Sequence, residues 1–363
     1  MAEFAFSLPI NSVSFGQVST GLLKEAFSRS LNPSLFPIGN IDLSTQDIEE
    51  NFQEWLQFCT KKGTEEHDRT LPVIKLWHLA GSLESFSQAQ ILLTFYEVDA
   101  PTKAELNVAK NHKTVFTSEY SKEVFDNAGA ETYCVPLFFD EFNFKRVMEN
   151  DQPKKYFEDE RITFNLTGKF EKRKHHHKII KSWLKRFGND NEYHLQACVY
   201  NNFFPKEQNI ALFQGATNGQ RYSNINFLNY MPTNDLYNDY LNSADVIIGM
   251  SGGEGWGLPE FHSVGLGKHG VILNAHGYKG WANEENSIFV QPKEKIDSYD
   301  DVFFKEGMQY NQGQIFDFDE EEFIFACETA IEKVKENRVN EAGLKIQEDF
   351  PVSKTLDSLL ELL

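Results

Sequence analysis

Short apolar runs alternate with amphipathic segments along most of the chain. Apolar spacing of three and four residues predicts helices after several of these runs, for example over 19–28 and 47–59. The apolar runs predict strands at 4–8, 33–43, 71–78, 90–97, 114–118, 132–137, 161–167, 193–199, 225–230, 244–249 and 270–274. Strands that alternate with helices in this way indicate an α/β fold with doubly wound sheets.

A polar, charged stretch at 143–160 interrupts this alternation and predicts a linker. With 363 residues, and about 150 residues in a typical domain, the chain should hold two domains. We therefore expect domains at 1–150 and 151–345, followed by a final segment at 346–363. Residues 201–220 carry no clear period and are expected to be irregular, whereas the acidic run at 317–322 and Thr233 should each cap a helix.

The most informative stretch covers residues 244–274, which read as strand, glycine-rich turn, helix and strand. Glycines in the turn allow the backbone to approach a ligand closely. A helix over about 258–266 would direct free N–H groups and its positive dipole end toward an anion such as phosphate. Glu254, within the turn, can accept hydrogen bonds from sugar hydroxyls. Turns after parallel strands lie at the sheet edge where such folds bind ligands.

A basic cluster, Gly168-Lys169-Phe170-Glu171-Lys172-Arg173-Lys174, follows the predicted strand at 161–167. It is conspicuous because the net charge of the chain is −19. That overall charge argues against nucleic acid and anionic membranes as main partners. His175, His176 and His177 are consecutive and so do not share a helix face, which argues against a metal site.

The remaining composition indicates a soluble, cytoplasmic protein. The four cysteines are far apart and form no Cys-x-x-Cys pair, which is typical of thiols in a reducing compartment. The first residues lack the basic region of a signal peptide. No apolar run approaches the roughly 20 residues that a membrane span needs.

The glycine turn and the basic cluster carry a family resemblance. Glu254-Gly255-Trp256-Gly257-Leu258-Pro259 resembles the Glu-Gly-Phe-Gly-Leu-Pro signature of glycosyltransferase family 4, which comprises retaining enzymes of the GT-B fold. Gly168–Lys174 resembles the Gly-Arg-x-x-x-x-Lys motif of that family, with lysine in place of arginine. The resemblance implies two Rossmann-like domains facing across a cleft, with the acceptor on the first and a nucleotide sugar on the second. It also implies that the C-terminal helix packs back on the first domain.

The resemblance assigns roles to particular residues. Lys169 and Lys174 would grip the donor diphosphate, and Glu254 would orient the donor sugar, so these three are the catalytic candidates. Two cations at a helix N-terminus would stabilise the charge that builds on a departing diphosphate. The donor-binding candidates are Gly16, Arg173, Asn229, Tyr230, Ser251, Gly253, Gly255, Trp256, Gly257, Leu258 and His262, and the candidates on the acceptor side of the cleft are His78, Tyr96 and Glu97.

The chain departs from the family at two positions. The family usually has a second glutamate eight residues after the first, to hold the ribose; that position is His262 here, and the nearest carboxylate is Glu260. A histidine can still hydrogen-bond a ribose. The family also commonly has Thr-x-His near Thr94, whereas Tyr96 stands at the histidine position.

The resemblance thus implies transfer of a sugar from a nucleotide-diphosphate sugar to a carbohydrate or other hydroxyl acceptor, with retention of configuration, and with neither a metal nor another cofactor. No pair of nucleophiles is evident, which fits a front-face mechanism. Two alternatives remain open: a non-catalytic GT-B protein that only binds nucleotide sugar, and a nucleotide-sugar epimerase.

Overall fold

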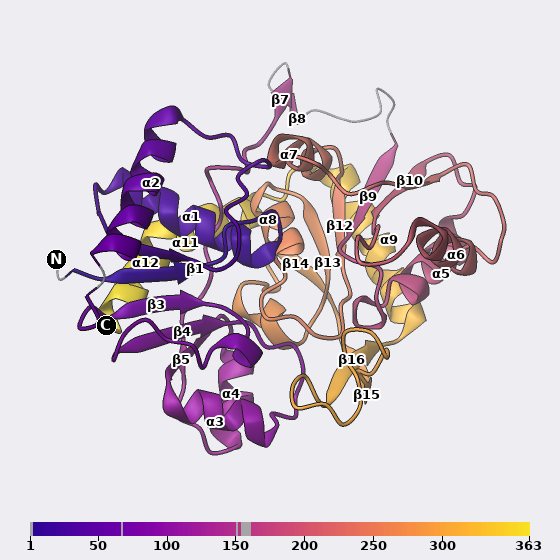
Figure 1. The fold of residues 1–363 in the computed structure, drawn as a ribbon. Helices are drawn as coiled ribbons and strands as arrows, with labels where there is room; N and C mark the ends of the chain where they lie inside the picture. The colour runs from indigo at the N-terminus through magenta and orange to yellow at the C-terminus, as the bar shows by residue number, and fades with distance from the viewer. Residues whose placement is uncertain (1–2, 67, 150–151, 154–160) are drawn as a thin grey trace.

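The computed structural model describes residues 3–66, 68–149, 152–153 and 161–363 and contains two six-stranded parallel sheets. The first has the order β2-β1-β3-β4-β5-β6 and the second β11-β10-β9-β12-β13-β14 (Figure 1). The strands are β1 (Ala5–Leu8), β2 (Ser34–Pro37), β3 (Val73–Leu76), β4 (Gln90–Thr94), β5 (Lys113–Phe116), β6 (Tyr133–Cys134), β9 (Ile162–Thr167), β10 (Tyr193–Cys198), β11 (Ile225–Phe227), β12 (Val246–Gly249), β13 (His269–Leu273) and β14 (Ser287–Val290).

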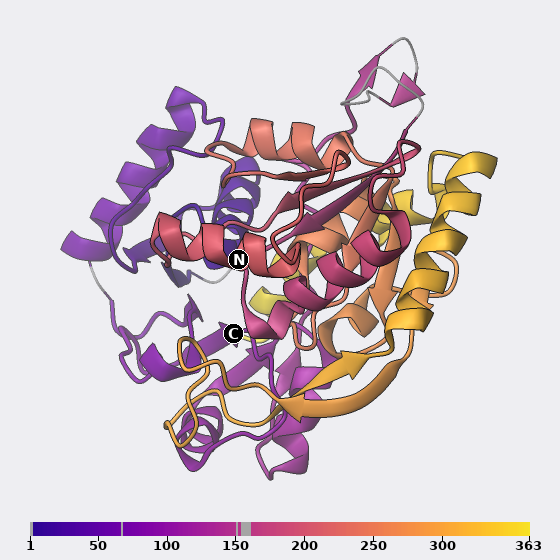
Figure 2. The ribbon, with the colours of Figure 1, turned by 90° about the vertical axis from the view of Figure 1, so that its right-hand side faces the viewer.

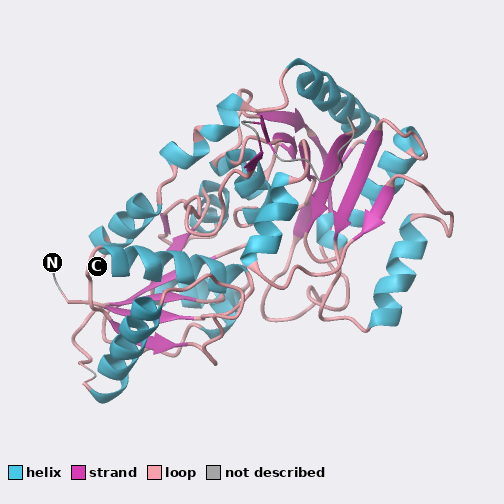
Figure 3. Cartoon of the chain, turned by 90° about the horizontal axis from the view of Figure 1, so that it is seen from above, coloured by secondary structure: helices cyan, strands magenta, loops and turns pink. Residues whose placement is uncertain are grey.

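Helices cover both faces of each sheet, as Figure 3 shows from above. They are α1 (Ser14–Ser28), α2 (Glu50–Glu65), α3 (Lys103–Asn111), α4 (Glu119–Asn127), α5 (His176–Phe187), α6 (Lys206–Ala216), α7 (Asn234–Asn242), α8 (Leu258–Gly265), α9 (Glu320–Glu336), α10 (Glu341–Leu344), α11 (Ile346–Asp349) and α12 (Val352–Glu361). The predicted α/β class and doubly wound sheets are confirmed. All eleven predicted strands are present, most of them shorter than predicted, and β14 extends the second sheet.

Helix caps explain several boundaries. The predicted caps are confirmed: Thr233 Oγ1 accepts from the backbone N–H of Leu236, and Asp319 accepts from two N–H groups at the start of α9. Helix α3, which the sequence analysis missed, begins with a capping box between Thr102 and Glu105.

Two segments differ from prediction. The stretch at 201–220 is not irregular throughout, because it contains α6. Helix α1 begins at Ser14, five residues earlier than predicted, so that Gly16 lies inside a helix and not in a loop.

The chain crosses between the sheets and later returns to the first one. The predicted boundary at residues 150–151 and part of the predicted linker lie outside the described residues. Within the described part, β7 (Met148–Glu149) pairs with β8 (Gln152–Pro153). At the end of the chain, α12 packs against α1, where Arg29 forms an ion pair with Asp357 at 2.5 Å and Thr355 Oγ1 donates to Pro136 O at 2.9 Å.

An antiparallel hairpin links the two halves a second time. It consists of β15 (Pro292–Asp297), β16 (Gln314–Phe318) and the loop between them, and we call it the 292–318 hairpin. Although it follows the second sheet in sequence, its Phe304 and Ile315 lie in an apolar cluster of the first half with Tyr96. Thr102 Oγ1 donates to Gln309 O at 2.5 Å. In Figure 2 the orange loop of this hairpin reaches the purple helices of the first half.

Candidate functional site

The glycine turn between β12 and α8 lies directly against the first half of the molecule. A Cβ at Gly253 would collide with the carbonyl oxygen of Glu97, and one at Gly255 would lie 2.8 Å from Cβ of Phe95. Thr117 Oγ1 donates to Gly255 O at 2.9 Å. Gly257 has a φ of +83° and faces the ring of Tyr278 so closely that no larger residue fits. These glycines let the turn meet the carboxyl ends of β4 and β5.

A buried charge cluster surrounds Glu254. Arg173 Nη1 donates to Glu254 Oε1 at 2.8 Å, and the Lys174 ammonium forms an ion pair with the same oxygen. Arg173 Nη2 contacts Glu171 at 2.8 Å and Glu97 at 3.2 Å. The side chain of Glu97 is one-third exposed (33%), whereas those of the other four are at most 8% exposed. Arg173 therefore connects the turn to the segment that follows β4 in the other half.

The charge states of this cluster follow from burial and mutual attraction. Burial by itself would raise the pKa of Glu254, but Arg173 and Lys174 outweigh it and hold the pKa well below its usual range. Burial likewise opposes the charge of Lys174, yet the attraction of Glu254 raises the pKa of that ammonium. Loss of hydration raises the pKa of Glu97 despite the nearby Arg173. Glu254 is thus a carboxylate held between two fixed cations.

Lys169, predicted with Lys174 to grip the donor diphosphate, makes its contacts outside the Glu254 cluster, and its predicted role stays a prediction. Its ammonium sits over two rings, 5.1 Å from the centre of Phe203 and 4.7 Å from that of Phe303. Its charge is also felt by His78, whose pKa is lowered by loss of hydration and then by Lys169. The cation that accompanies Lys174 at Glu254 is Arg173.

Helix α8 presents His262 to the protein and not to an open site. Nε2 of His262 accepts from Asp140 N–H at 3.3 Å, and its ring lies 4.4 Å from that of Phe144 and 5.5 Å from that of Phe139. Burial lowers the pKa of His262 to about 3, so that the ring is neutral. His262 therefore contacts the chain that crosses between the sheets, and its contact with a ribose stays a prediction.

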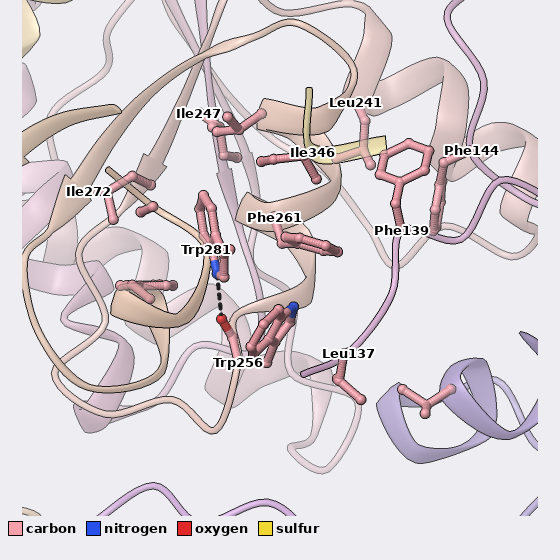
Figure 4. Packing of buried hydrophobic residues seen from close by; sticks show 14 of the residues in the cluster. Leu137, Phe139, Phe144, Leu241, Ile247, Trp256, Phe261, Ile272, Trp281 and Ile346 are labelled. Atoms are coloured by element: carbon pink, nitrogen blue, oxygen red, sulfur yellow. Dashed lines mark hydrogen bonds between the residues drawn. The ribbon is translucent and has the colours of Figure 1, made fainter. Parts of the chain in front are cut away.

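Three further candidates also pack within the protein. Tyr96, expected at the cleft, is buried and its hydroxyl contacts Glu105 Oε2 at 3.4 Å. The ring of Trp256 is 2% exposed and packs on Phe261, while the Trp256 carbonyl accepts from Trp281 Nε1 at 2.9 Å (Figure 4). Gly16 packs against the carbonyl of Asn11 in the first turn of α1.

The other donor-side candidates surround the turn or lie after β11. Ser251 Oγ donates to Gly253 O at 3.2 Å, and Leu258 begins α8. Asn229 and Tyr230 are exposed, and the Tyr230 hydroxyl donates to Ser12 O at 3.0 Å, beside the loop that follows β1. These positions border the carboxyl edges of both sheets.

Two acidic residues of the site were not among the sequence candidates. Glu171 binds Arg173, and its position between lysines was the available signal. Glu260 lies under the turn, where the absence of a side chain at Gly249 leaves room for it, and burial raises its pKa to about 7. Within the described ranges, no group of three His, Cys, Asp or Glu side chains is arranged to hold a metal ion. The described helices include none with the length and apolar character needed to span a bilayer.

Comparisons with known proteins identify the fold. Neither a family model nor a curated protein matches the chain in sequence. Among solved structures, the sucrose-phosphate synthase of Thermosynechococcus elongatus has a TM-score of 0.63 at 12% identity over 99% of this chain and 94% of that one. WaaG, a glycosyltransferase involved in lipopolysaccharide biosynthesis, has a TM-score of 0.63 at 10% identity over 99% of both chains. HepE of Anabaena, solved with UDP-glucose, has a TM-score of 0.61 at 13% identity over 99% of this chain and 100% of that one. The chain has the GT-B fold, as predicted.

Proposed function

We propose that the chain is a glycosyltransferase that moves a sugar from a nucleotide-diphosphate sugar to an acceptor hydroxyl. The observation that carries this proposal is the arrangement of Glu254, Arg173 and Lys174 beside the N-terminus of α8, at the carboxyl edge of a Rossmann-like sheet. Ligands of such sheets bind at that edge. The GT-B neighbours support the class of reaction, and the complex of HepE with UDP-glucose supports a nucleotide-sugar donor.

Each group in this arrangement has a role in the proposal. Lys174, Arg173 and the first N–H groups of α8 would stabilise the negative charge that develops on the departing diphosphate. Glu254 would accept hydrogen bonds from the donor sugar, once the ligand displaces one of its two cations. We propose further that configuration is retained, that no metal or other cofactor is required, and that the departing phosphate takes the proton of the acceptor hydroxyl.

A thermal-shift titration tests donor binding. Wild type, Lys174→Ala and the control Lys172→Ala are heated with UDP, GDP, ADP and their glucose conjugates, with and without EDTA. A ligand at 100 times its Kd stabilises a protein by about 2.7 kcal/mol, which raises Tm by several degrees. We expect one nucleotide to stabilise wild type and Lys172→Ala but not Lys174→Ala, with EDTA making no difference.

Product analysis then separates the alternatives. If the protein is a transferase, an acceptor should raise the rate of nucleoside diphosphate release above the slow rate of donor hydrolysis. The anomeric configuration of the product, measured by NMR, should match that of the donor. Binding without any release would identify a non-catalytic protein, and conversion of the sugar without an acceptor would identify an epimerase. If none of the nucleotides stabilises the wild-type protein, the proposal is wrong.

A further inference from the structure

The glycine turn that carries Glu254 touches the first half of the molecule at the segment after β4. A Cβ at Gly253 would collide with the carbonyl oxygen of Glu97, so the two backbones are in direct contact. Thr117 Oγ1 also holds the turn, by donating to Gly255 O at 2.9 Å. Because any sugar is larger than a methyl group, a donor sugar at Glu254 in the cleft requires the turn and the first half to move apart.

The 292–318 hairpin fastens the two halves together beside this contact. The Lys295 ammonium donates to Asp99 Oδ2 at 2.7 Å, and the backbone N–H of Gln314 donates to Asp99 Oδ1 at 2.7 Å. Lys295 lies on β15 and Gln314 on β16. One carboxylate of the first half therefore binds both strands of the hairpin, through hydrogen bonds that its charge strengthens.

A second carboxylate of the first half binds the loop of the hairpin. Glu105 Oε1 accepts from the backbone N–H of Asn311 at 2.8 Å. Beside it, the N–H of Ala100 donates to Gln312 O at 3.2 Å. Glu105 is buried, so the carboxylate depends on these protein donors to replace water. The loop is thus bound to the first half by specific polar contacts in addition to its apolar ones.

The same hairpin also holds the glycine turn. The N–H of Phe316 donates to Gly252 O at 2.8 Å, and Phe316 O accepts from His175 Nε2 at 2.8 Å. The preceding residue, Ile315, lies in the apolar cluster of the first half with Tyr96. Successive side chains of a strand point to opposite faces, so β16 can contact the turn and the first half at once.

We infer that the 292–318 hairpin is a strap that holds the glycine turn against the first half, and that its release from Asp99 and Glu105 opens the cleft. The inference rests on the proposed function only in taking the entering ligand to be a nucleotide sugar at Glu254. The apparent affinity for a ligand is reduced by the fraction of molecules that can bind it. Weaker fastening of the strap should therefore tighten ligand binding.

Calorimetric titration with UDP tests this expectation. Asp99→Ala removes the acceptor that both strands of the hairpin share. We expect its Kd for UDP to be about tenfold lower than that of wild type, because hydrogen bonds to a charged group are strong enough to shift such an equilibrium by this factor. Loss of an ordinary structural contact would leave the Kd unchanged or raise it, and either result would overturn the inference.

Two lysine variants control for the change in charge. Lys295→Met removes a positive charge, which by itself should weaken binding of an anion, yet release of the strap should lower its Kd about threefold. Lys293→Met makes the same change two residues away, where the ammonium pairs with Asp319 of the second half at 3.4 Å. This control should bind UDP no more tightly than wild type. Equal Kd values for the two lysine variants would contradict a strap.

Hydrogen exchange measured by mass spectrometry detects release of the strap without a ligand. In Asp99→Ala we expect faster exchange in the hairpin and also in the glycine turn at 250–257, which is far from the substitution in sequence. Lys293→Met should exchange like wild type in both segments. Faster exchange that is confined to the neighbourhood of residue 99 would overturn the inference, whatever the result with UDP.

The two measurements together separate this inference from the proposed function. If Asp99→Ala binds UDP more tightly and its glycine turn exchanges faster, both stand. If UDP binds wild type and Asp99→Ala equally well, the strap is wrong and the proposed function survives. If UDP, GDP and ADP bind neither protein but the glycine turn exchanges faster in Asp99→Ala, the proposed function falls and the strap stands.

Discussion

The two sheets are built alike but differ at their carboxyl edges. The second sheet has the Rossmann order 3-2-1-4-5-6 when its strands are numbered from β9, whereas the first has the order 2-1-3-4-5-6 numbered from β1. Charged residues follow β9 and β12, namely Arg173, Lys174 and Glu254. Aromatic residues and His78 follow β3 and β4. Two similar sheets thus have different side chains at their carboxyl edges, because the loops after the strands supply these side chains and the strands do not.

The largest expected effect is the loss of the Arg173 charge at the carboxyl edge of the second sheet, which we call the charged edge. Arg173→Met would leave Glu97, Glu171 and Glu254 around an uncharged side chain. Breaking a buried ion pair typically lowers stability by about 3–5 kcal/mol. Urea unfolding should show a loss in this range. Arg186→Met is the matched control, since its ion pair with Glu328 is largely exposed and should be worth less than about 1 kcal/mol. Similar losses in both variants would mean that burial does not distinguish the charged edge.

A smaller loss is expected from placing a charge on helix α8 of the second half, where it packs on the chain that crosses between the sheets. His262→Glu would put a carboxyl among Phe139 and Phe144, where it must stay protonated or remain poorly solvated. We expect a loss of about 2–3 kcal/mol by urea unfolding and no gain in UDP affinity. His262→Gln keeps an acceptor for the N–H of Asp140 and should be milder. Tighter UDP binding by the glutamate variant would show that this position faces the donor after all.

The contact between the two edges is tested at Gly253. A methyl group there would meet the carbonyl of Glu97, and overpacking of this kind costs about 1–3 kcal/mol. Gly253→Ala should lower Tm accordingly and weaken UDP binding, because the turn must shift. Gly215→Ala in α6 has open space around it and should be slightly more stable than wild type, by up to about 1 kcal/mol. If Gly253→Ala behaves like this control, the edges are not in tight contact.

The smallest effect concerns Glu260, a buried carboxyl beneath the glycine turn whose pKa is raised by burial. The folded pKa of Glu260 is about 7, above the roughly 4.3 of an unfolded glutamate. Its stabilising contribution is therefore complete below about pH 4 and is lost as the pH rises toward 7. Glu260→Gln should remove this loss and gain about 1–2 kcal/mol on wild type between pH 5 and pH 8, less than the full shift because the amide also needs partners. Parallel stability profiles of the two proteins would contradict the raised pKa.

The sequence was sufficient for the elements whose signals are local. The strand, turn and helix at 244–274 were predicted from glycines between two apolar runs, and the caps at Thr233 and Asp319 from residue type alone. Helix α6 was missed because it buries only Asn209 and Ala216 and so shows no apolar stripe. Helix α3 was missed although its capping box is readable in the sequence.

The site was less predictable because it depends on contacts between distant segments. No local pattern shows that Arg173 meets Glu97 from the other half, or that Lys169 rests on Phe303, which lies 134 residues later in the sequence. The neutral, buried state of His262 depends on the chain crossing at Asp140, which a motif does not contain. Residue type therefore indicated the chemistry of the site, whereas tertiary packing decided which side chains remain available to a ligand.

The 292–318 hairpin has a consequence for how the protein is made. Tyr96, Phe116 and Phe125 share their apolar cluster with Phe304 and Ile315, so the first sheet cannot finish burying this surface when its own strands leave the ribosome. At typical synthesis rates of about 5–20 residues per second, the missing side chains arrive roughly 10–40 s later. During that interval the nascent chain exposes aromatic surface that chaperones recognise. The apolar cluster of the first half is thus completed only after all six strands of the second sheet have been made.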